Sequence, residues 1–177
     1  MAVKEREAEA VQEALEAGLE LESRGIGFYS RAAQEVRDPK GRQTLLFLAE
    51  EEREHREFIR ELLESLKERD DSLLKGAVQK QRARKDTRVF PELEEYVEEI
   101  RDSRGDRKIL DEAAEIEKRS IEFYREAGKD IENRDYQEIF RILIKEEEGH
   151  LALVRQMADY MVLHGVWSGL EDYFANE

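Results

Sequence analysis

The chain has 177 residues, about the size of one domain, and its 42% charged residues with only ten glycines and two prolines are typical of an almost entirely helical protein. Its formal net charge of −14 argues against a nucleic-acid partner, because phosphate binding depends on clustered lysine and arginine. The sequence has no cysteine, which excludes disulfides, zinc–thiolate sites and iron–sulfur centres.

Four long amphipathic segments follow one another along the chain. Apolar residues at alternating spacings of three and four predict helices at residues 5–37 and about 40–68, separated by a turn at Asp38-Pro39 with Pro39 in the first helical position. The same pattern predicts a second pair of helices at about 107–131 and 136–164. Between them, Asn133 and Asp135 are predicted to supply the turn and the N-cap, with Glu138 completing a capping box.

Residues 69–106, between the two pairs, are less regular. They contain the basic stretch KQRARK, then Val89-Phe90-Pro91 and a predicted short helix at 92–101. A connection of this length fits a crossover that returns along the molecule before the third long helix begins. We interpret the basic stretch as a solvated face, with docking of an acidic electron-transfer partner as the alternative.

The predicted fold is therefore an all-α four-helix bundle with a short C-terminal helix. We expect residues 1–177 to form one domain, with repeat one at about 8–68, the crossover at 69–106 and repeat two at about 107–164. The tail at 165–177 is expected to pack on the bundle or on a second subunit. Its apolar residues are Trp167, Leu170, Tyr173 and Phe174.

Two Glu-x-x-His pairs interrupt the apolar stripes of the second and fourth segments. Three residues make almost one helical turn, so both side chains of a pair project from one face. The second pair lies 95 residues after the first (147 − 52 and 150 − 55), and the same offset relates a glutamate on each preceding helix, which indicates a duplicated helix pair. The residues so related are Glu22, Glu52 and His55 in the first half and Glu117, Glu147 and His150 in the second.

These four glutamates and two histidines predict a metal centre inside the bundle. Moving an ionised carboxylate into a protein interior costs on the order of several kcal/mol, whereas two divalent cations would neutralise four carboxylates and accept two neutral imidazoles. Oxygen and imidazole donors favour iron or manganese, and this set is the one that ferritin-like dinuclear bundles use. The alternative is a set of solvated helix faces, because one Glu-x-x-His carries little information among 44 acidic residues.

The chain resembles the rubrerythrin-like branch of the ferritin-like superfamily over about residues 10–165. The likeness rests on Glu22 with Phe28-Tyr29, on EEEREH, on Glu117 with Phe123-Tyr124, and on EEEGH. It implies two iron ions, with manganese as an alternative, held by Glu22, Glu52, His55, Glu117, Glu147 and His150. It also suggests that Tyr29 and Tyr124 hydrogen-bond to ligand carboxylates, although both could be core aromatics with a satisfied hydroxyl.

The glutamates that directly precede the metal-binding glutamates, Glu51 and Glu146, match an acidic position that orients metal-bound imidazoles in many di-iron proteins. We expect each to accept the free ring N–H of the histidine in the other half. The alternative is that both are surface glutamates in a very acidic chain.

The sequence also departs from rubrerythrin in two respects. Without cysteine it cannot hold the rubredoxin-type iron that feeds electrons to the di-iron site, so any reductant has to come from another protein. The further glutamate one turn after the third-helix ligand is replaced by Ser120, and its counterpart after Glu22 is Gly25. We expect these small residues to leave room for dioxygen, peroxide or a mobile iron.

The resemblance implies an oxidoreductase that reduces hydrogen peroxide or dioxygen with an external electron donor. A ferroxidase or iron-storage protein, with Fe²⁺ as substrate, and a metal-binding helical module without turnover are the alternatives. We further expect a homodimer with no nucleic-acid or membrane partner. Because no run of about 18 apolar residues and no signal-peptide core is present, a cytoplasmic location is expected.

Overall fold

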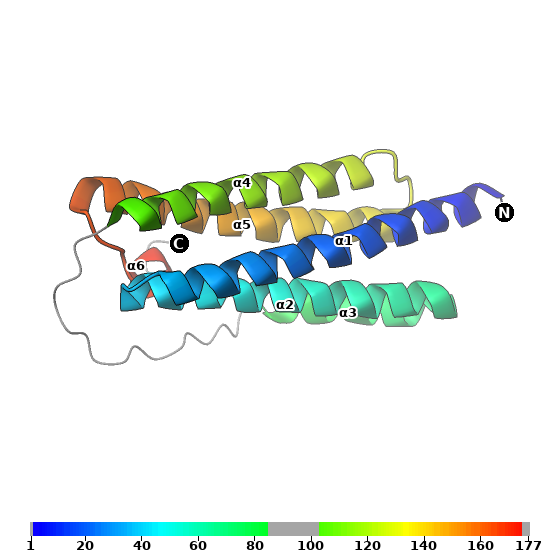
Figure 1. The fold of residues 1–177 in the computed structure, drawn as a ribbon. Helices are drawn as coiled ribbons and strands as arrows, with labels where there is room; N and C mark the ends of the chain where they lie inside the picture. The colour runs from blue at the N-terminus through cyan, green and yellow to red at the C-terminus, as the bar shows by residue number, and fades with distance from the viewer. Residues whose placement is uncertain (1, 85–102, 175–177) are drawn as a thin grey trace.

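The computed structural model describes residues 2–84 and 103–174, and these residues form helices and no strands (Figure 1). The two long hairpins are α1 (Ala2–Glu35) with α2 (Pro39–Glu68), and α4 (Ser103–Gly128) with α5 (Arg134–His164). A crossover helix, α3 (Asp71–Arg84), lies between them in sequence, and α6 (Leu170–Phe174) closes the described chain. The predicted all-α four-helix bundle of two helix pairs is confirmed.

The helix ends are set by local chemistry. The Asp38 carboxylate accepts hydrogen bonds from the backbone N–H groups of Lys40 at 2.8 Å and Gly41 at 3.2 Å, with Pro39 in the first turn as predicted. At the other hairpin Asn133 is the N-cap, with its side-chain oxygen 2.8 Å from the Asp135 nitrogen. The predicted capping box of Asp135 and Glu138 is therefore wrong, because Asn133 supplies the cap.

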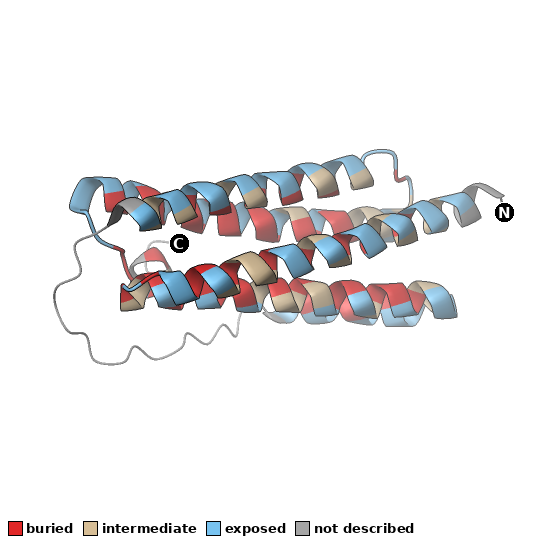
Figure 2. Cartoon of the chain, in the orientation of Figure 1, coloured by how far each residue is buried: buried red, intermediate tan, exposed pale blue. Residues whose placement is uncertain are grey.

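The buried faces of the four long helices point into the space between the two hairpins (Figure 2). Two apolar clusters fill this space. The first lies toward α6 and includes Ala33, Leu45, Leu48, Leu110, Val154, Met157 and Trp167. The second lies toward α3 and includes Val11, Leu15, Ile59, Leu62, Leu74, Ile139 and Leu143. Both clusters reach the stretch of the bundle where the predicted metal-binding residues lie.

The crossover contains a helix that the sequence pattern did not predict. α3 starts directly after the Asp70 carboxylate, which accepts hydrogen bonds from the N–H groups of Ser72 at 2.8 Å and Leu73 at 3.3 Å. Its buried residues follow a helical spacing and pack on α2 and α5. They are Leu74, Ala77, Val78 and Gln81. The sequence pattern does not predict this helix because its short apolar stripe is followed by basic residues. The helix predicted at 92–101 lies outside the described residues.

The tail packs on the bundle of its own chain. Trp167, 3% exposed, lies so close to α2 that a Cβ at Gly41 would stand 2.4 Å from its ring. Its indole N–H donates to Asp106 at 2.9 Å, which fastens the tail to α4. Among the described helices, none combines the length and the apolar composition that spanning a bilayer requires.

Candidate metal centre

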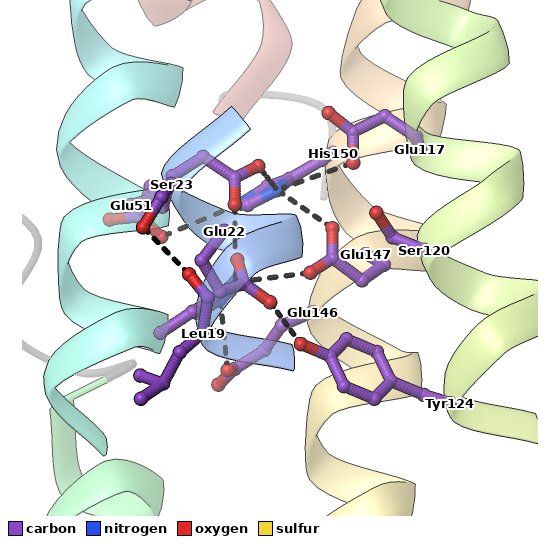
Figure 3. Close-up of polar contacts among 12 residues, drawn as sticks. Leu19, Glu22, Ser23, Glu51, Glu117, Ser120, Tyr124, Glu146, Glu147 and His150 are labelled. Carbon is purple, nitrogen blue, oxygen red and sulfur yellow. Dashed lines mark hydrogen bonds and ion pairs between the residues drawn. The ribbon is translucent and has the colours of Figure 1, made fainter. Parts of the chain in front are cut away.

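The six residues singled out by the repeat lie together in the interior. Each comes from one of the four long helices, and none is more than 5% exposed. They are Glu22 of α1, Glu52 and His55 of α2, Glu117 of α4, and Glu147 and His150 of α5. Figure 3 shows side chains from the opposing helices converging between the ribbons. The alternative of solvated helix faces is therefore wrong for these residues.

The six residues divide into two overlapping groups of four, and within each group one ligand atom per residue lies within 4.8 Å of the others. We call these the His55 half (Glu22, Glu52, His55 and Glu147) and the His150 half (Glu52, Glu117, Glu147 and His150). Glu52 and Glu147 belong to both. A carboxylate has two oxygens, so it can serve two cations at once, and the arrangement suits a dinuclear centre with these two glutamates between the ions.

Both imidazoles turn the same ring nitrogen toward the carboxylates. The Nδ1 atom of His55 lies 3.2 Å from Glu147 and 3.5 Å from Glu22. The Nδ1 atom of His150 lies 3.4 Å from Glu147 and 3.6 Å from Glu52. The two rings are stacked with centroids 5.1 Å apart. In each half the Nδ1 atom is thus the donor available to a cation, while Nε2 faces outward.

Two buried tyrosines link the two hairpins. The Tyr29 hydroxyl on α1 donates a hydrogen bond to Glu117 on α4, and the Tyr124 hydroxyl on α4 donates to Glu22 on α1. Burial raises the pKa of both phenols, so they remain donors at neutral pH. Each tyrosine therefore fixes the carboxylate of the opposite hairpin, leaving its second oxygen for a cation.

The outer nitrogens of the two histidines face Glu146 and Glu51, the predicted partners, at unequal distances. His55 Nε2 lies 3.1 Å from a carboxylate oxygen of Glu146, and His150 Nε2 lies 4.0 Å from Glu51. The same Glu146 oxygen accepts a 3.0 Å hydrogen bond from the Gln81 amide of α3. Sequence reasoning missed Gln81, although it is the last residue of the Leu74, Ala77 and Val78 stripe.

The small residues near the centre allow close approach. A Cβ at Gly25 would stand 3.1 Å from the carboxylate carbon of Glu52, and one at Gly18 would stand 3.1 Å from the Tyr124 hydroxyl. Ser120 is buried, and its hydroxyl donates to the Ile116 carbonyl at 3.3 Å. The space that the small Gly25 leaves is therefore filled by the shared Glu52 carboxylate, which packs against α1.

The charges of the centre compete for protons when no cation is bound. Burial, with the charge of Glu147, raises the pKa of Glu52 well above its ordinary value, and burial raises that of Glu117 to about 7. Burial opposes protonation of the histidines, but hydrogen bonds to Glu146 and Glu147 raise the pKa of His55, and bonds to Glu117 and Glu147 raise that of His150. Burial alone would raise the pKa of Glu147, but its hydrogen bonds with His150 and His55 outweigh burial and lower this pKa.

The donor set fits a bound cation. Within the described part of the chain, three buried atoms of the cluster have no hydrogen-bond partner: Oε2 of Glu117, Oε2 of Glu147 and Nδ1 of His150. An unpartnered buried polar atom costs about 1–3 kcal/mol, and all three belong to the His150 half. A cation placed among them would satisfy all three at once, with oxygen and imidazole donors that suit iron or manganese.

Comparison with known proteins agrees with this architecture. The rubrerythrin family model matches residues 13–158. None of the curated proteins matches the sequence significantly. A solved structure of a hypothetical protein from Pyrococcus furiosus is similar over 86% of this chain and 90% of its own, with a TM-score of 0.60 and 18% sequence identity. At that identity the likeness supports the fold alone.

Proposed function

Because the chain belongs to the rubrerythrin family, we propose that it is a non-haem di-iron oxidoreductase that reduces hydrogen peroxide or dioxygen with electrons from an external donor. The observation that carries this proposal is the pair of overlapping ligand groups that share Glu52 and Glu147. Two iron ions held side by side supply two electrons, one from each, which is the number that reduces one hydrogen peroxide to water.

In this proposal the chain's own residues hold and orient the metals. The four glutamates and the two Nδ1 atoms would be the ligands, and Glu52 and Glu147, which belong to both groups, would be available to either ion. Tyr29 and Tyr124 keep Glu117 and Glu22 in position through hydrogen bonds from the opposite hairpin. The apolar clusters on either side limit the access of water to the centre.

The external donor is part of the proposal because the 177 residues contain no cysteine that could ligate a rubredoxin-type iron. Ferroxidase activity is the second candidate, because the same two ligand groups would also bind Fe²⁺ as a substrate. Both candidates use the same six ligands, so they differ in the substrate and not in the residues that bind iron.

Aerobic addition of Fe²⁺ to the metal-free protein separates the candidates. Oxidation that stops at about two irons per chain, with peroxide consumed only when a reductant is supplied, supports the peroxide or dioxygen reductase. Continued oxidation of added Fe²⁺ supports the ferroxidase. An oxidation rate equal to that of Fe²⁺ in buffer would contradict both and leave a metal-binding module without turnover.

Ligand substitutions test the centre itself. The Glu52→Ala and Glu147→Ala variants are expected to lose bound iron, measured by elemental analysis of protein purified from its native host, which also decides between iron and manganese. Glu50→Ala and Glu148→Ala are matched controls, since these glutamates are exposed and pair with Arg53 and Arg125. Unchanged metal content in the first two variants would show that the ligand set is wrong.

A further inference from the structure

The crossover helix reaches the candidate metal centre through one side chain. Gln81 of α3 is 6% exposed, and its amide Nε2 donates to Oε2 of Glu146 at 3.0 Å. The same oxygen lies 3.1 Å from Nε2 of His55. A chain of polar contacts thus runs from α3 through α5 to the imidazole of α2, and it ends on the ring whose other nitrogen faces Glu22 and Glu147.

The second histidine has a looser environment. Its Nε2 lies 4.0 Å from Glu51, whereas the Nε2 of His55 lies 3.1 Å from Glu146. The Glu51 side chain is 18% exposed against 7% for the Glu146 side chain, and the His150 side chain is 7% exposed against 2% for the His55 side chain. The two repeats therefore place an equivalent glutamate beside the outer nitrogen of each histidine, but the distance is shorter at His55 than at His150.

The difference arises from α3, which lies between the two repeats. In the second repeat, the described chain continues after α5 only into the five-residue α6. α3 is fixed by its buried apolar stripe, and Gln81 is flanked by Lys80, which pairs with Glu61 of α2, and Arg82, which pairs with Glu138 of α5. Exposed pairs of this kind contribute little by themselves, so the buried stripe is what keeps the Gln81 amide in place.

We propose that Gln81 is a positioning residue that makes the two halves of the centre unequal, an inference that rests on the metal centre proposed above. An amide that holds the Glu146 carboxylate keeps the His55 N–H directed outward and its Nδ1 lone pair directed at the cation. The ion of the His55 half is then bound more tightly than it would be without the amide. The ion next to Glu117 and His150 has no such support from α3.

Stepwise binding of Mn²⁺, followed by the electron paramagnetic resonance signal of the free ion, tests this inference without any turnover. The wild-type chain is expected to bind two ions in two separated steps. Gln81→Leu removes the amide at similar volume and should weaken one of the two steps by about tenfold, the lower end of the effect of removing such an outer contact, while the other step changes less than twofold. Lys80→Ala is the control on the same helix and should change neither step.

A matched pair of substitutions at repeat-related positions completes the design. Glu146→Ala should weaken the same step at least as much as Gln81→Leu does, and Glu51→Ala should leave that step within twofold. A general loss of stability would weaken both steps together, so an equal shift of both in Gln81→Leu would overturn the inference, and so would no shift in either. Failure of the wild-type chain to bind two Mn²⁺ or two Fe²⁺ would instead contradict the proposed function.

Discussion

The metal-free protein should lose stability as the pH rises through neutrality, and Glu117 allows the size of the effect to be worked out. Its buried carboxyl has a pKa of about 7 in the folded chain, against an ordinary value of 4.5. A group whose pKa is raised by folding stabilises the folded state fully below its unfolded pKa, and this contribution is lost as the pH rises through the folded value. The window for Glu117 is therefore about pH 4.5 to 7.

Each pH unit of such a rise corresponds to about 1.4 kcal/mol, so Glu117 alone accounts for about 3 kcal/mol of the free energy of unfolding. For a chain of this length 1 kcal/mol shifts the melting temperature by roughly 2–4 °C, which gives a fall of about 6–12 °C between pH 5 and pH 8. The raised pKa values of Glu52, His55 and His150 act in the same direction. The lowered pKa of Glu147 acts in the opposite direction at acid pH, where its carboxylate becomes protonated.

The assay is thermal unfolding followed by circular dichroism in the presence of chelator, at several pH values. Glu117→Gln is the specific control, because its amide keeps an acceptor for the Tyr29 hydroxyl but cannot ionise; its melting temperature should fall less with pH than that of the wild type, by about the amount given above. With metal bound the trend should reverse, since cations replace protons at these groups and are bound more tightly as the pH rises. A metal-free melting temperature that is flat or rises from pH 5 to pH 8 would refute the reasoning.

Three further substitutions are expected to act at separate points. Tyr124→Phe leaves a buried carboxylate oxygen without its donor and should lower the stability of the metal-free protein by about 1–3 kcal/mol, measured by urea unfolding. Gly25→Ala places a Cβ 3.1 Å from the Glu52 carboxylate carbon, so the metal affinity measured by calorimetric titration should fall, although the alanine stabilises the helix itself by up to about 1 kcal/mol. Unchanged affinity would show that the carboxylate can move away freely. Gly41→Ala puts a Cβ 2.4 Å from the Trp167 ring and should cost about 1–3 kcal/mol through overpacking, with a red shift in the fluorescence of this single tryptophan as the indole becomes exposed.

The long helices could be predicted because each carries a sustained apolar stripe and ends at a residue with a clear local role. The turn at Asp38-Pro39 is one such point, and the observed helix starts at Pro39. The second turn was harder, because Asn133 and Asp135 are both good caps and only the structure shows that Asn133 accepts the hydrogen bonds. α3 was missed because its apolar stripe spans only two turns and is followed by the basic stretch KQRARK.

The convergence of the six residues could also be predicted, since a repeat offset fixes which faces of the two hairpins are equivalent. The side-chain partners across the hairpins could be predicted only in part. Tyr29 and Tyr124 were expected near carboxylates, but their reach into the opposite hairpin depends on how the pairs pack. Gln81 could not be found from the repeat, because α3 lies outside it. The external donor, the homodimer and the cytoplasmic location remain predictions.

The sharing of Glu52 and Glu147 constrains how the two repeats can have diverged. Neither hairpin can complete a coordination group alone, because each group of four takes at least one carboxylate from the other hairpin. A substitution of Glu52 or Glu147 would therefore affect both groups, while the outward faces are free of this constraint; the exposed Glu57 and its counterpart Ala152 differ entirely.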